Sequence, residues 1–282
     1  MKPRLPKFLV VGAMKAATTT LFEDLATHPQ IFAPIEKEPG YLCSDDVFCE
    51  ELDSCYGPLF EGARPYQLCF EASTYYTMRP DNEGVAERAK KLVGPNLKVI
   101  YLVREPVARS VSHHAHAHAR GDCDSDVNKA IYSMPRLIGY SKYFYQIEPW
   151  LQVFGEDNVF ILTQEYYVRH RRDSIEAIET FLGLDPSVDR INTEWVGNQR
   201  STLVEDTSLT RILRSSKLYQ RGIRRFLSPS MRSSWKRVFM RRIARPVSML
   251  SEETRKFIID ETSEDIGRLA PFVRLKEPGG WV

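Results

Sequence analysis

Four short, continuous runs of apolar residues constrain the fold of this chain more than any other feature. They span residues 8–12, 67–70, 98–103 and 158–162, and residues 31–33 form a candidate fifth run. Strands that are buried on both faces of a parallel sheet have continuous apolar runs, whereas strands with one face in water alternate. The runs therefore predict a parallel sheet that is covered on both sides.

Segments with helical periodicity separate these runs. The expected helices span residues 19–27, 82–93, 107–120, 143–154, 174–182 and 252–269. Gly94-Pro95 and Gly183 are typical of helix ends, and Ser251 is a typical N-cap. The alternation of strands and helices predicts an α/β fold with right-handed crossovers and a helical C-terminal extension.

The composition fits one folded domain over residues 1–282. Hydrophobic residues make up 43% of the chain and charged residues 27%, which excludes a disordered or collagen-like protein. The apolar stretch near the N-terminus is too short to cross a bilayer, and no signal peptide is predicted. Without an anchor or signal we expect a cytoplasmic chain. A domain cut from a membrane-anchored protein would look similar, but Met1 just before the first strand favours a complete chain. An odd number of cysteines without metal-binding spacing predicts free thiols at Cys43, Cys49, Cys55, Cys69 and Cys123.

Basic residues are concentrated in one segment near the C-terminus. Twelve lie between positions 207 and 251 with no acidic residue among them, whereas the rest of the chain has 27 basic and 37 acidic residues. We expect this segment to be helical. It is typical either of a surface that contacts a sugar polymer, a phosphate or a lipid headgroup, or of a solvated helical face. The sequence leaves both interpretations open.

The turn after the first strand has the composition of an anion-binding loop. Gly12 is followed by Lys15 and then by Thr18, Thr19 and Thr20 at the start of a helix. The N–H groups of a helix N-terminus bind anions, to which lysine adds a charge and threonine a hydroxyl donor. The spacing departs from the Gly-x-x-x-x-Gly-Lys-Ser/Thr loop of triphosphate enzymes, so a magnesium–triphosphate site is disfavoured. The alternative is an ordinary strand-to-helix turn.

A second candidate anion site follows the strand at 98–103. Arg104 stands at the strand end, Pro106 suits the first turn of a helix, and Ser112 follows two turns later. A guanidinium and a hydroxyl can hold the same phosphate. Ligands of open parallel sheets bind beyond the carboxyl ends of the strands, where we expect several charged residues to converge. These are Lys15, Glu36, Lys37, Glu38, Glu71 and Arg104.

Together the two motifs resemble those of the sulfotransferases that use 3′-phosphoadenosine 5′-phosphosulfate (PAPS). Lys15-Ala-Ala-Thr-Thr-Thr is similar to the 5′-phosphosulfate loop of that family, and the segment from Arg104 to Ser112 is similar to its 3′-phosphate motif. Residues 36–42 (Glu-Lys-Glu-Pro-Gly-Tyr-Leu) and 71–76 (Glu-Ala-Ser-Thr-Tyr-Tyr) resemble segments of the branch that includes heparan sulfate sulfotransferases and bacterial relatives. The resemblance implies a P-loop NTPase-like, three-layer fold with a central parallel sheet.

The resemblance also implies roles for individual residues. Lys15 would contact the bridging oxygen of PAPS, and Glu38 would be the general base that takes the proton of the acceptor. Arg104 and Ser112 would hold the 3′-phosphate, and Arg200 would lie in a basic loop over the nucleotide. The loop that holds the 5′-phosphate would comprise Lys15, Ala16, Ala17, Thr18, Thr19 and Thr20. No metal is implied.

The sequence departs from the family pattern in three segments. Ala17 stands where the family usually has glycine, and Ala72 where heparan-type enzymes have a lysine in the acceptor site. Gly40-Tyr41-Leu42 replaces His-Phe-Phe. These differences put a heparan-like acceptor in question but leave the sulfuryl donor unchanged.

Four histidines lie close together at positions 113, 114, 116 and 118. His114 and His118 share a helical face, but no cysteine or metalloprotease glutamate lies at metal-binding spacing, so we expect no metal site. His116 lies one turn after Ser112 and faces the same way. We therefore hypothesise that His116 lines the acceptor site; the alternative is a histidine packed beneath the rim.

The sequence predicts a PAPS-dependent sulfotransferase that acts on a hydroxyl of a carbohydrate or of a natural product. One alternative is a nucleotide-dependent P-loop kinase, which would bind a triphosphate with magnesium. The other is a protein whose basic segment at 207–251 binds nucleic acid or an anionic lipid. On the favoured interpretation we expect a small-molecule or glycan acceptor and no nucleic-acid partner, with 207–251 available for peripheral contact with an anionic surface. The oligomeric state does not follow from the sequence.

Overall fold

The computed structural model describes residues 4–48, 52–193, 204–206, 240–242 and 248–282. Arg200 and most of the basic segment at 207–251 lie outside the described residues. Within that segment, Met240–Arg242 form a strand, β7, which pairs antiparallel with β6 (Val204–Asp206). These three residues are therefore not helical, in contrast to the expectation for the whole segment.

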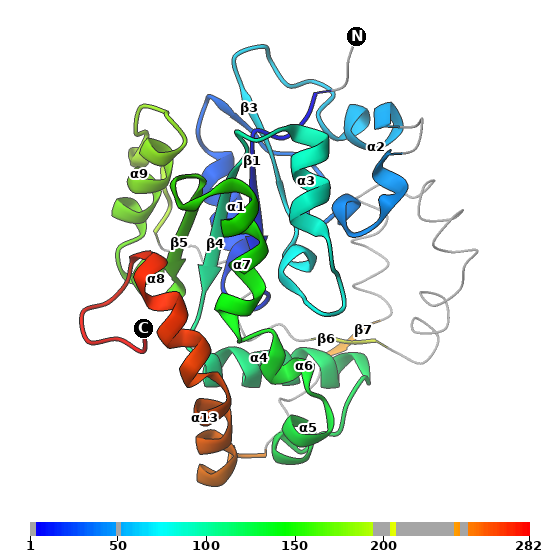
Figure 1. Ribbon diagram of the computed structural model, residues 1–282, viewed down its shortest axis with the longest axis vertical. Helices are drawn as coiled ribbons and strands as arrows, with labels where there is room; N and C mark the ends of the chain where they lie inside the picture. Colours follow the sequence, from blue (N-terminus) through cyan, green and yellow to red (C-terminus); the bar gives the residue numbers. More distant parts are fainter. Residues whose placement is uncertain (1–3, 49–51, 194–203, 207–239, 243–247) are drawn as a thin grey trace.

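A six-stranded sheet with the order β2-β3-β1-β4-β5-β8 forms the centre of the described structure (Figure 1). All neighbouring strands are parallel, which confirms the predicted α/β architecture. The strands are β1 (Phe8–Gly12), β2 (Ile31–Phe32), β3 (Leu68–Ala72), β4 (Lys98–Val103), β5 (Val159–Thr163) and β8 (Val273–Leu275). Strand β8 was not predicted, and β3 extends two residues beyond the predicted run.

Helices connect the strands and cover the sheet. Figure 1 shows α3 and α7 in front of it. The predicted helices are present as α1 (Thr18–Ala26), α3 (Val85–Val93), α4 (Pro106–Arg120), α7 (Tyr143–Phe154), α9 (Arg171–Phe181) and α13 (Glu252–Leu269). Four shorter helices were not predicted: α2 (Leu52–Leu59), α5 (Val127–Ser133), α6 (Arg136–Gly139) and α8 (Gln164–Arg169). In the part of the chain described, none of the helices has the length and apolar character needed to cross a membrane.

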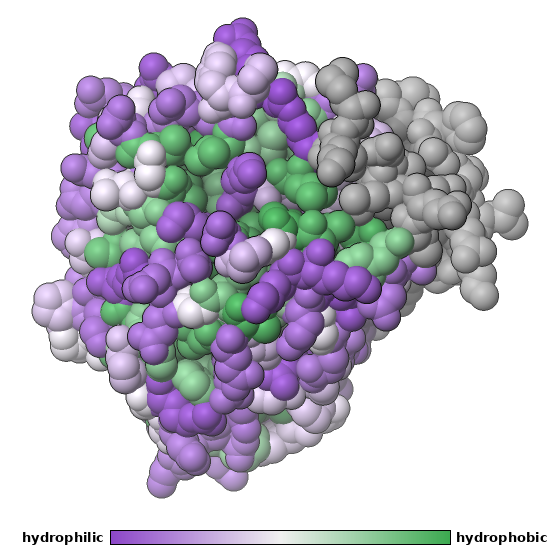
Figure 2. Space-filling model, turned by 45° about the horizontal axis from the view of Figure 1, so that its top comes forward, coloured by the Kyte–Doolittle hydropathy of each residue, from purple (hydrophilic) through white to green (hydrophobic). Residues whose placement is uncertain are grey.

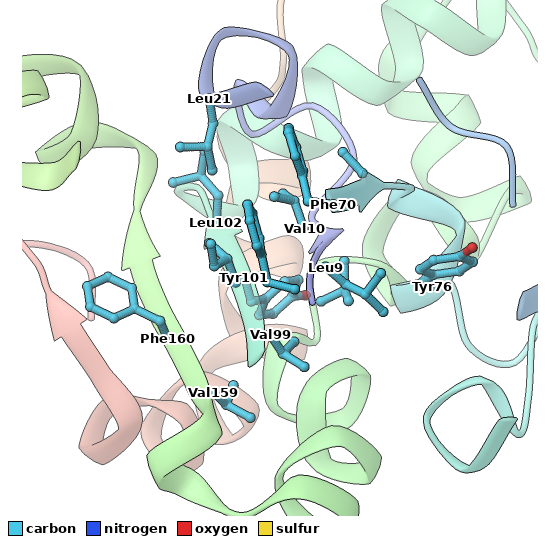
Figure 3. Packing of buried hydrophobic residues seen from close by; sticks show 14 of the residues in the cluster. Leu9, Val10, Leu21, Phe70, Tyr76, Val99, Tyr101, Leu102, Val159 and Phe160 are labelled. Atoms are coloured by element: carbon cyan, nitrogen blue, oxygen red, sulfur yellow. The ribbon is translucent and has the colours of Figure 1, made fainter. Parts of the chain in front are cut away.

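The core forms between the strands and the helices on both faces. Every residue of β1 and β5 is buried, and alternate side chains of a strand point to opposite faces, so both faces of the sheet are covered. Figure 3 shows the packing of Phe70, Val10 and Tyr101 from three adjacent strands. Phe8 of β1 and Phe70 of β3 stack with ring centroids 4.8 Å apart.

An ion pair buried beneath the first helix fixes α1 to the neighbouring helices. Asp24 of α1 accepts two hydrogen bonds from Arg171 of α9, each 2.6 Å long, and one from the Tyr167 hydroxyl of α8. Removing one partner of a buried pair would leave an uncompensated charge, which costs about 3–5 kcal/mol. Helix α1, which follows the Lys15 loop, is therefore attached to α8 and α9 through Asp24.

Polar and apolar residues are interspersed on the end of the molecule that Figure 2 brings forward. This end carries the N-terminus, whereas α4 lies at the opposite end (Figure 1). Strand β4 leads directly into α4, so the carboxyl ends of the strands lie at the α4 end. The candidate site is built at that end.

Candidate active site

The loop after β1 has the backbone conformation of a glycine-rich anion loop. Lys15 and Ala17 have φ angles of 70° and 69°, in the left-handed region that favours glycine. Ala17 therefore keeps the conformation of the glycine that it replaces, at a cost of about 1–2 kcal/mol. At Gly12 a side chain would collide with the Thr77 hydroxyl, so this position requires glycine.

The N-termini of α1 and α4 differ in how their N–H groups are satisfied. Ala17 is the N-cap of α1 and has no side-chain oxygen, whereas Glu105 caps α4 by accepting from Val107 and Ala108. An anion therefore suits the N-terminus of α1, while that of α4 already holds a carboxylate. In the loop before α1, the Ala16 amide donates to the Ala13 carbonyl at 3.2 Å. Thr18 and Thr20 are buried and Thr19 is half-buried.

The two anion-binding motifs meet, as predicted. The Arg104 guanidinium donates to the Lys15 carbonyl oxygen at 3.1 Å, across 89 residues of sequence. The Tyr143 hydroxyl donates to the Arg104 carbonyl at 2.5 Å and thereby fixes the end of β4. Ser112 and His116 lie half-buried one turn apart on α4. Arginine and lysine are thus placed at the carboxyl ends of the adjacent strands β1 and β4.

Glu38 lies beside the carboxyl end of β3, on the other side of β1 from β4. Its amide donates to the Ala72 carbonyl at 2.9 Å, and its φ angle of 61° turns the chain sharply. The Glu38 carboxylate accepts from Lys37 Nζ at 3.0 Å and from Thr74 Oγ1 at 3.1 Å. The side chain remains 34% exposed, so a solvent-borne molecule can reach it. Ala72, the position of the family lysine, is buried.

His116 lies within electrostatic reach of both Lys15 and Glu38. Burial and the positive charge of Lys15 lower the pKa of His116 to about 4, while the Glu38 carboxylate acts in the opposite direction. His116 is therefore a neutral imidazole at neutral pH. Lys15 and Glu38, predicted from two separate segments, thus both act electrostatically on His116 in the folded chain.

Glu71 does not lie at the rim, in contrast to our expectation. It belongs to β3, is fully buried, and accepts hydrogen bonds from Tyr56 at 2.7 Å, from Ser73 at 3.0 Å and from Tyr76. Burial raises the pKa of Glu71, and these hydrogen bonds act against that increase. The prediction failed because β3 continues to Ala72, so position 71 lies inside the sheet and not beyond it.

Arg109 is a buried cation that the sequence reasoning missed. Its guanidinium donates to the Ser141 hydroxyl and to the Leu137 carbonyl, and lies 3.4 Å from His113 Nδ1. Burial lowers the pKa of Arg109, and Arg104 acts in the same direction. Among the described residues no carboxylate forms an ion pair with it, so its charge adds to the positive field at the carboxyl end of β4. The signal in the sequence was a second arginine five positions after Arg104.

A cavity of about 160 Å³ lies next to the site, beyond the carboxyl ends of β5 and β8. The Trp281 indole donates to Glu165 at 3.1 Å, and Glu165 also accepts from the Glu105 amide at 3.0 Å. Glu165 and Glu277 both line the cavity, together with Arg169 and Lys276. Two carboxylates make it a poorer phosphate site than the Lys15 loop, where cations predominate.

The other histidines of α4 have structural partners. His113 stacks on Tyr140 with ring centroids 5.5 Å apart, and His114 Nε2 lies 2.9 Å from the Asp124 carbonyl oxygen. No group of three or more metal-ligating side chains comes together in the described ranges.

The buried histidines predict a loss of stability in acid. Burial and Arg109 lower the pKa of His113 to about 2, and that of His116 is lowered to about 4. Unfolded histidine titrates near 6.5, so below that pH the unfolded chain binds protons that the folded chain does not. The free energy of unfolding should therefore fall as the pH decreases from 6.5 towards 4, by up to about 1.4 kcal/mol per pH unit for each histidine.

Urea unfolding at pH 7 and pH 5 measures this loss. Carboxylates also titrate in this range, so the comparison with His113→Gln isolates the histidine contribution. We expect His113→Gln to lose less stability between the two pH values than the unsubstituted protein. An equal loss in both proteins would contradict the assignment of His113 as a buried neutral group.

The parallel sheet and the loop after β1 define an α/β protein with a P-loop-like fold. The chain belongs to the sulfotransferase family, since the model of the sulfotransferase domain matches residues 5–257. It is similar to the mouse heparan sulfate glucosamine 3-O-sulfotransferase 5, with 24% identity over 204 residues and coverage of 67% of this chain and 56% of the relative. It is also similar to the Drosophila melanogaster bifunctional heparan sulfate N-deacetylase/N-sulfotransferase, with 26% identity over 219 residues and coverage of 67% and 20%. The chain thus spans about half, or less, of the length of these relatives.

Solved structures share the fold. A sulfotransferase from Alicyclobacillus acidocaldarius aligns with a TM-score of 0.65 and 20% identity, covering 97% of this chain and 98% of the other. A mouse sulfotransferase in complex with PAP (adenosine 3′,5′-bisphosphate) aligns with a TM-score of 0.52 and 16% identity. The alignment covers 96% of this chain and 89% of the other. The arrangement of strands and helices is therefore that of sulfotransferases.

Proposed function

We propose that this chain transfers the sulfuryl group of PAPS to a hydroxyl group of an acceptor. The observation that carries the proposal is the contact between the Arg104 guanidinium and the Lys15 carbonyl. It joins two anion-binding motifs at the ends of adjacent strands, as a nucleotide with a phosphate at each end of its ribose requires. Family membership supports the same reaction.

In this proposal the donor binds through both motifs. The N-terminus of α1, with Lys15 and Thr18–Thr20, holds the 5′-phosphosulfate, because helix N–H groups and a lysine both favour negative charge. Arg104 and Ser112 hold the 3′-phosphate through charge-assisted hydrogen bonds. The buried charge of Arg109 strengthens the local positive field without touching the nucleotide.

The reaction is an in-line substitution at sulfur. Glu38 removes the proton of the acceptor hydroxyl while the oxygen bonds to sulfur. The bond between sulfur and the bridging phosphate oxygen breaks, and Lys15 stabilises the charge that develops on the departing phosphate. The products are a sulfate ester and adenosine 3′,5′-bisphosphate (PAP). His116, held neutral by its surroundings, is available to the acceptor as a hydrogen-bonding group.

The acceptor is, in our proposal, a carbohydrate hydroxyl in the first place and a small natural product in the second. The names of the similar proteins refer to heparan sulfate, which supports a carbohydrate acceptor. The buried Ala72 offers no counterpart to the acceptor-site lysine of the heparan branch, so the acceptor need not carry a negative charge there. A panel of neutral and anionic sugars and phenolic natural products, incubated with PAPS, tests this by the mass gain of one sulfate.

The binding of PAP and of AMP, which lacks the 3′-phosphate, tests the donor site. We expect PAP to bind more tightly than AMP, and Arg104→Ala to weaken PAP binding by about 10–100-fold, as charged hydrogen bonds imply, while AMP changes little. Isothermal titration calorimetry measures both affinities.

Arg268→Ala is the matched control for this experiment, because Arg268 pairs with Glu148 on the surface and lies on α13. Its affinity for PAP should equal that of the unsubstituted protein. Equal binding of PAP and AMP, or stronger binding of ATP with magnesium, would argue for a different nucleotide site.

A further inference from the structure

We propose that the buried Glu71 is a positioning residue that fixes the catalytic Glu38 loop, defined as residues 36–42, on the sheet. The inference rests on the proposed function only in its assignment of Glu38 as the base. From its position in the sequence we expected Glu71 to be one of three carboxylates at the rim, together with Glu36 and Glu38. The hydrogen bonds around it give it a different role.

Two parallel relays connect the Glu38 loop to Glu71. In the first, the Gly40 amide donates to Ser73 Oγ at 3.1 Å, and Ser73 donates to Glu71 Oε1 at 3.0 Å. In the second, the Leu42 amide donates to the Tyr76 hydroxyl at 3.2 Å, and Tyr76 donates to the same carboxylate oxygen. The Gly40 and Leu42 amides are thus each connected by one hydroxyl group to the same carboxylate of Glu71.

The direction of these hydrogen bonds requires an acceptor at position 71. Each hydroxyl accepts from an amide through a lone pair and donates its own proton to Glu71, and a buried O–H group that has lost its acceptor destabilises the arrangement. Glu71 Oε1 accepts hydrogen bonds from the hydroxyls of Ser73 and Tyr76, and Oε2 accepts one from the Tyr56 hydroxyl. Because the carboxylate is fully buried, water cannot substitute for it.

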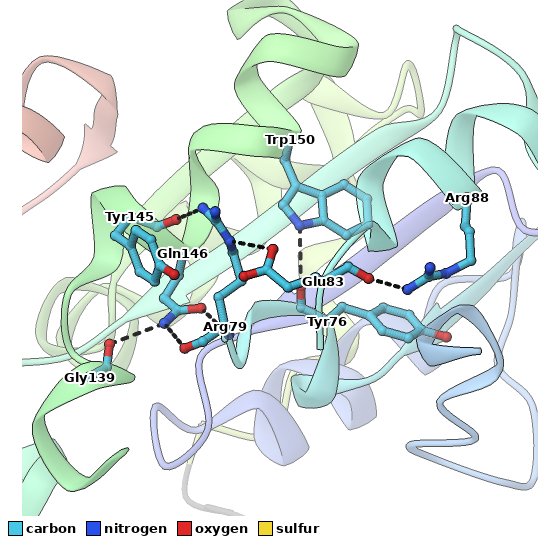
Figure 4. Close-up of polar contacts among 8 residues, drawn as sticks. All are labelled: Tyr76, Arg79, Glu83, Arg88, Gly139, Tyr145, Gln146 and Trp150. Atoms are coloured by element: carbon cyan, nitrogen blue, oxygen red, sulfur yellow. Dashed lines mark hydrogen bonds and ion pairs between the residues drawn. The ribbon is translucent and has the colours of Figure 1, made fainter. Parts of the chain in front are cut away.

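The loop is also held at its far end. Arg88 of α3 donates to the Leu42 carbonyl at 2.6 Å, and the Trp150 indole donates to the Tyr76 carbonyl at 3.3 Å. Figure 4 shows Arg88 and Trp150 on the helices beside Tyr76. Tyr76 is therefore fixed at its backbone by α7 and at its hydroxyl by Glu71, so it offers the Leu42 amide a stationary acceptor.

The loop needs this support because its backbone is strained. Glu38 has a φ of 61°, which costs a residue with a side chain about 1–3 kcal/mol and persists only where the surroundings enforce it. The hydrogen bond from the Glu38 amide to the Ala72 carbonyl and the two relays attach the loop at three points within residues 38–42. Without the relays we expect Glu38 to leave the position that its bonds to Lys37 and Thr74 define. A displacement of about 1 Å is enough to lower a reaction rate by ~10²-fold.

Amide hydrogen exchange over residues 36–42 tests the proposal without any acceptor. Glu71→Met, which keeps the volume and removes the acceptor, should accelerate exchange of the Gly40 and Leu42 amides by about tenfold or more, as the loss of a hydrogen bond implies. Glu71→Gln should retain most of the protection, because its amide oxygen can accept from Ser73 and Tyr76 while its NH₂ group donates to Tyr56.

Two further variants separate positioning from a general loss of stability. Ser73→Ala combined with Tyr76→Phe removes both relays and leaves Glu71 in place, so exchange in the loop should again accelerate. Tyr56→Phe, the matched control, keeps the ring that packs against Tyr41 of the loop and removes the hydroxyl that donates to Glu71 Oε2, so it should leave Gly40 and Leu42 protected. Exchange in the central strand β4 and the thermal midpoint report whether each variant is folded.

Unchanged exchange of Gly40 and Leu42 in the double variant, or equal acceleration in Tyr56→Phe, would overturn the proposal. PAP affinity, measured on the same proteins, should be within about twofold of the unsubstituted value, because Lys15 and Arg104 are not part of the relays. Failure of the unsubstituted protein to bind PAP would refute the proposed function but leave the result on the loop intact.

Discussion

Replacing Lys15 by alanine should lower the rate of sulfuryl transfer by about 10²–10³-fold. Lys15 lies in the loop just before α1, and in the proposed mechanism it stabilises the charge that develops on the departing phosphate. Removing one preorganised donor of this kind costs about 2.7–4 kcal/mol of transition-state stabilisation. Single-turnover formation of PAP from PAPS, with an acceptor from the panel, measures the effect on the chemical step.

An independent measurement accompanies this experiment. Lys15 is one of the charges that lower the pKa of His116, so Lys15→Ala should raise that pKa, as followed by NMR titration. Lys142→Ala removes a lysine that pairs with Glu261 on the surface and should leave both the rate and the pKa unchanged. A full rate in Lys15→Ala would refute its role at the leaving group.

Replacing Glu38 by glutamine should lower kcat by about 10²–10⁴-fold, the usual contribution of a positioned general base. Glutamine keeps the size of the side chain and can still accept from Thr74, but it cannot remove a proton. PAP affinity should not change, since Glu38 lies beside β3, on the other side of β1 from Arg104. Steady-state kinetics with PAPS varied, together with calorimetry of PAP, separate the two effects.

The exposed Glu61→Gln serves as the matched control for Glu38→Gln and should retain full activity. If Glu38→Gln kept its rate and His116→Gln lost it, the base would be His116. If Glu38→Gln instead weakened PAP binding and left kcat intact, Glu38 would belong to the donor site.

The strands of the sheet could be predicted because burial on both faces leaves a plain mark in the sequence. The bounds of β1 and β4 agree with the apolar runs, as do those of α7 and α13 with their helical periodicity. Strand β8 has only three residues, and its central residue, Arg274, is exposed. It therefore lacks the apolar run that predicted the other strands. Its pairing with β5 is a tertiary effect that local sequence does not contain.

The contact between Arg104 and Lys15 followed from a simple rule, since residues just beyond parallel strands meet at one edge. Lys37, which pairs with Glu38, is its neighbour in the sequence, but Thr74 could not be found in this way. Thr74 reaches Glu38 because β3 continues to Ala72 and then turns, which brings Thr74 next to the loop. The predicted run ended at residue 70, two residues before the end of β3. Glu71, which is buried inside the sheet, was therefore expected at the rim.

The position of β1 in the sheet has a consequence for how the protein is made. Its two neighbours are β3 and β4, whose residues follow it by roughly sixty and ninety positions in the chain. On the ribosome, β1 therefore emerges before β3 and β4 have been synthesised. Because β1 pairs only in parallel, it cannot form a local β-hairpin with the next segment of the chain. Until β4 has also been synthesised, this buried, apolar strand lacks a partner on at least one side, which favours aggregation of the incomplete chain.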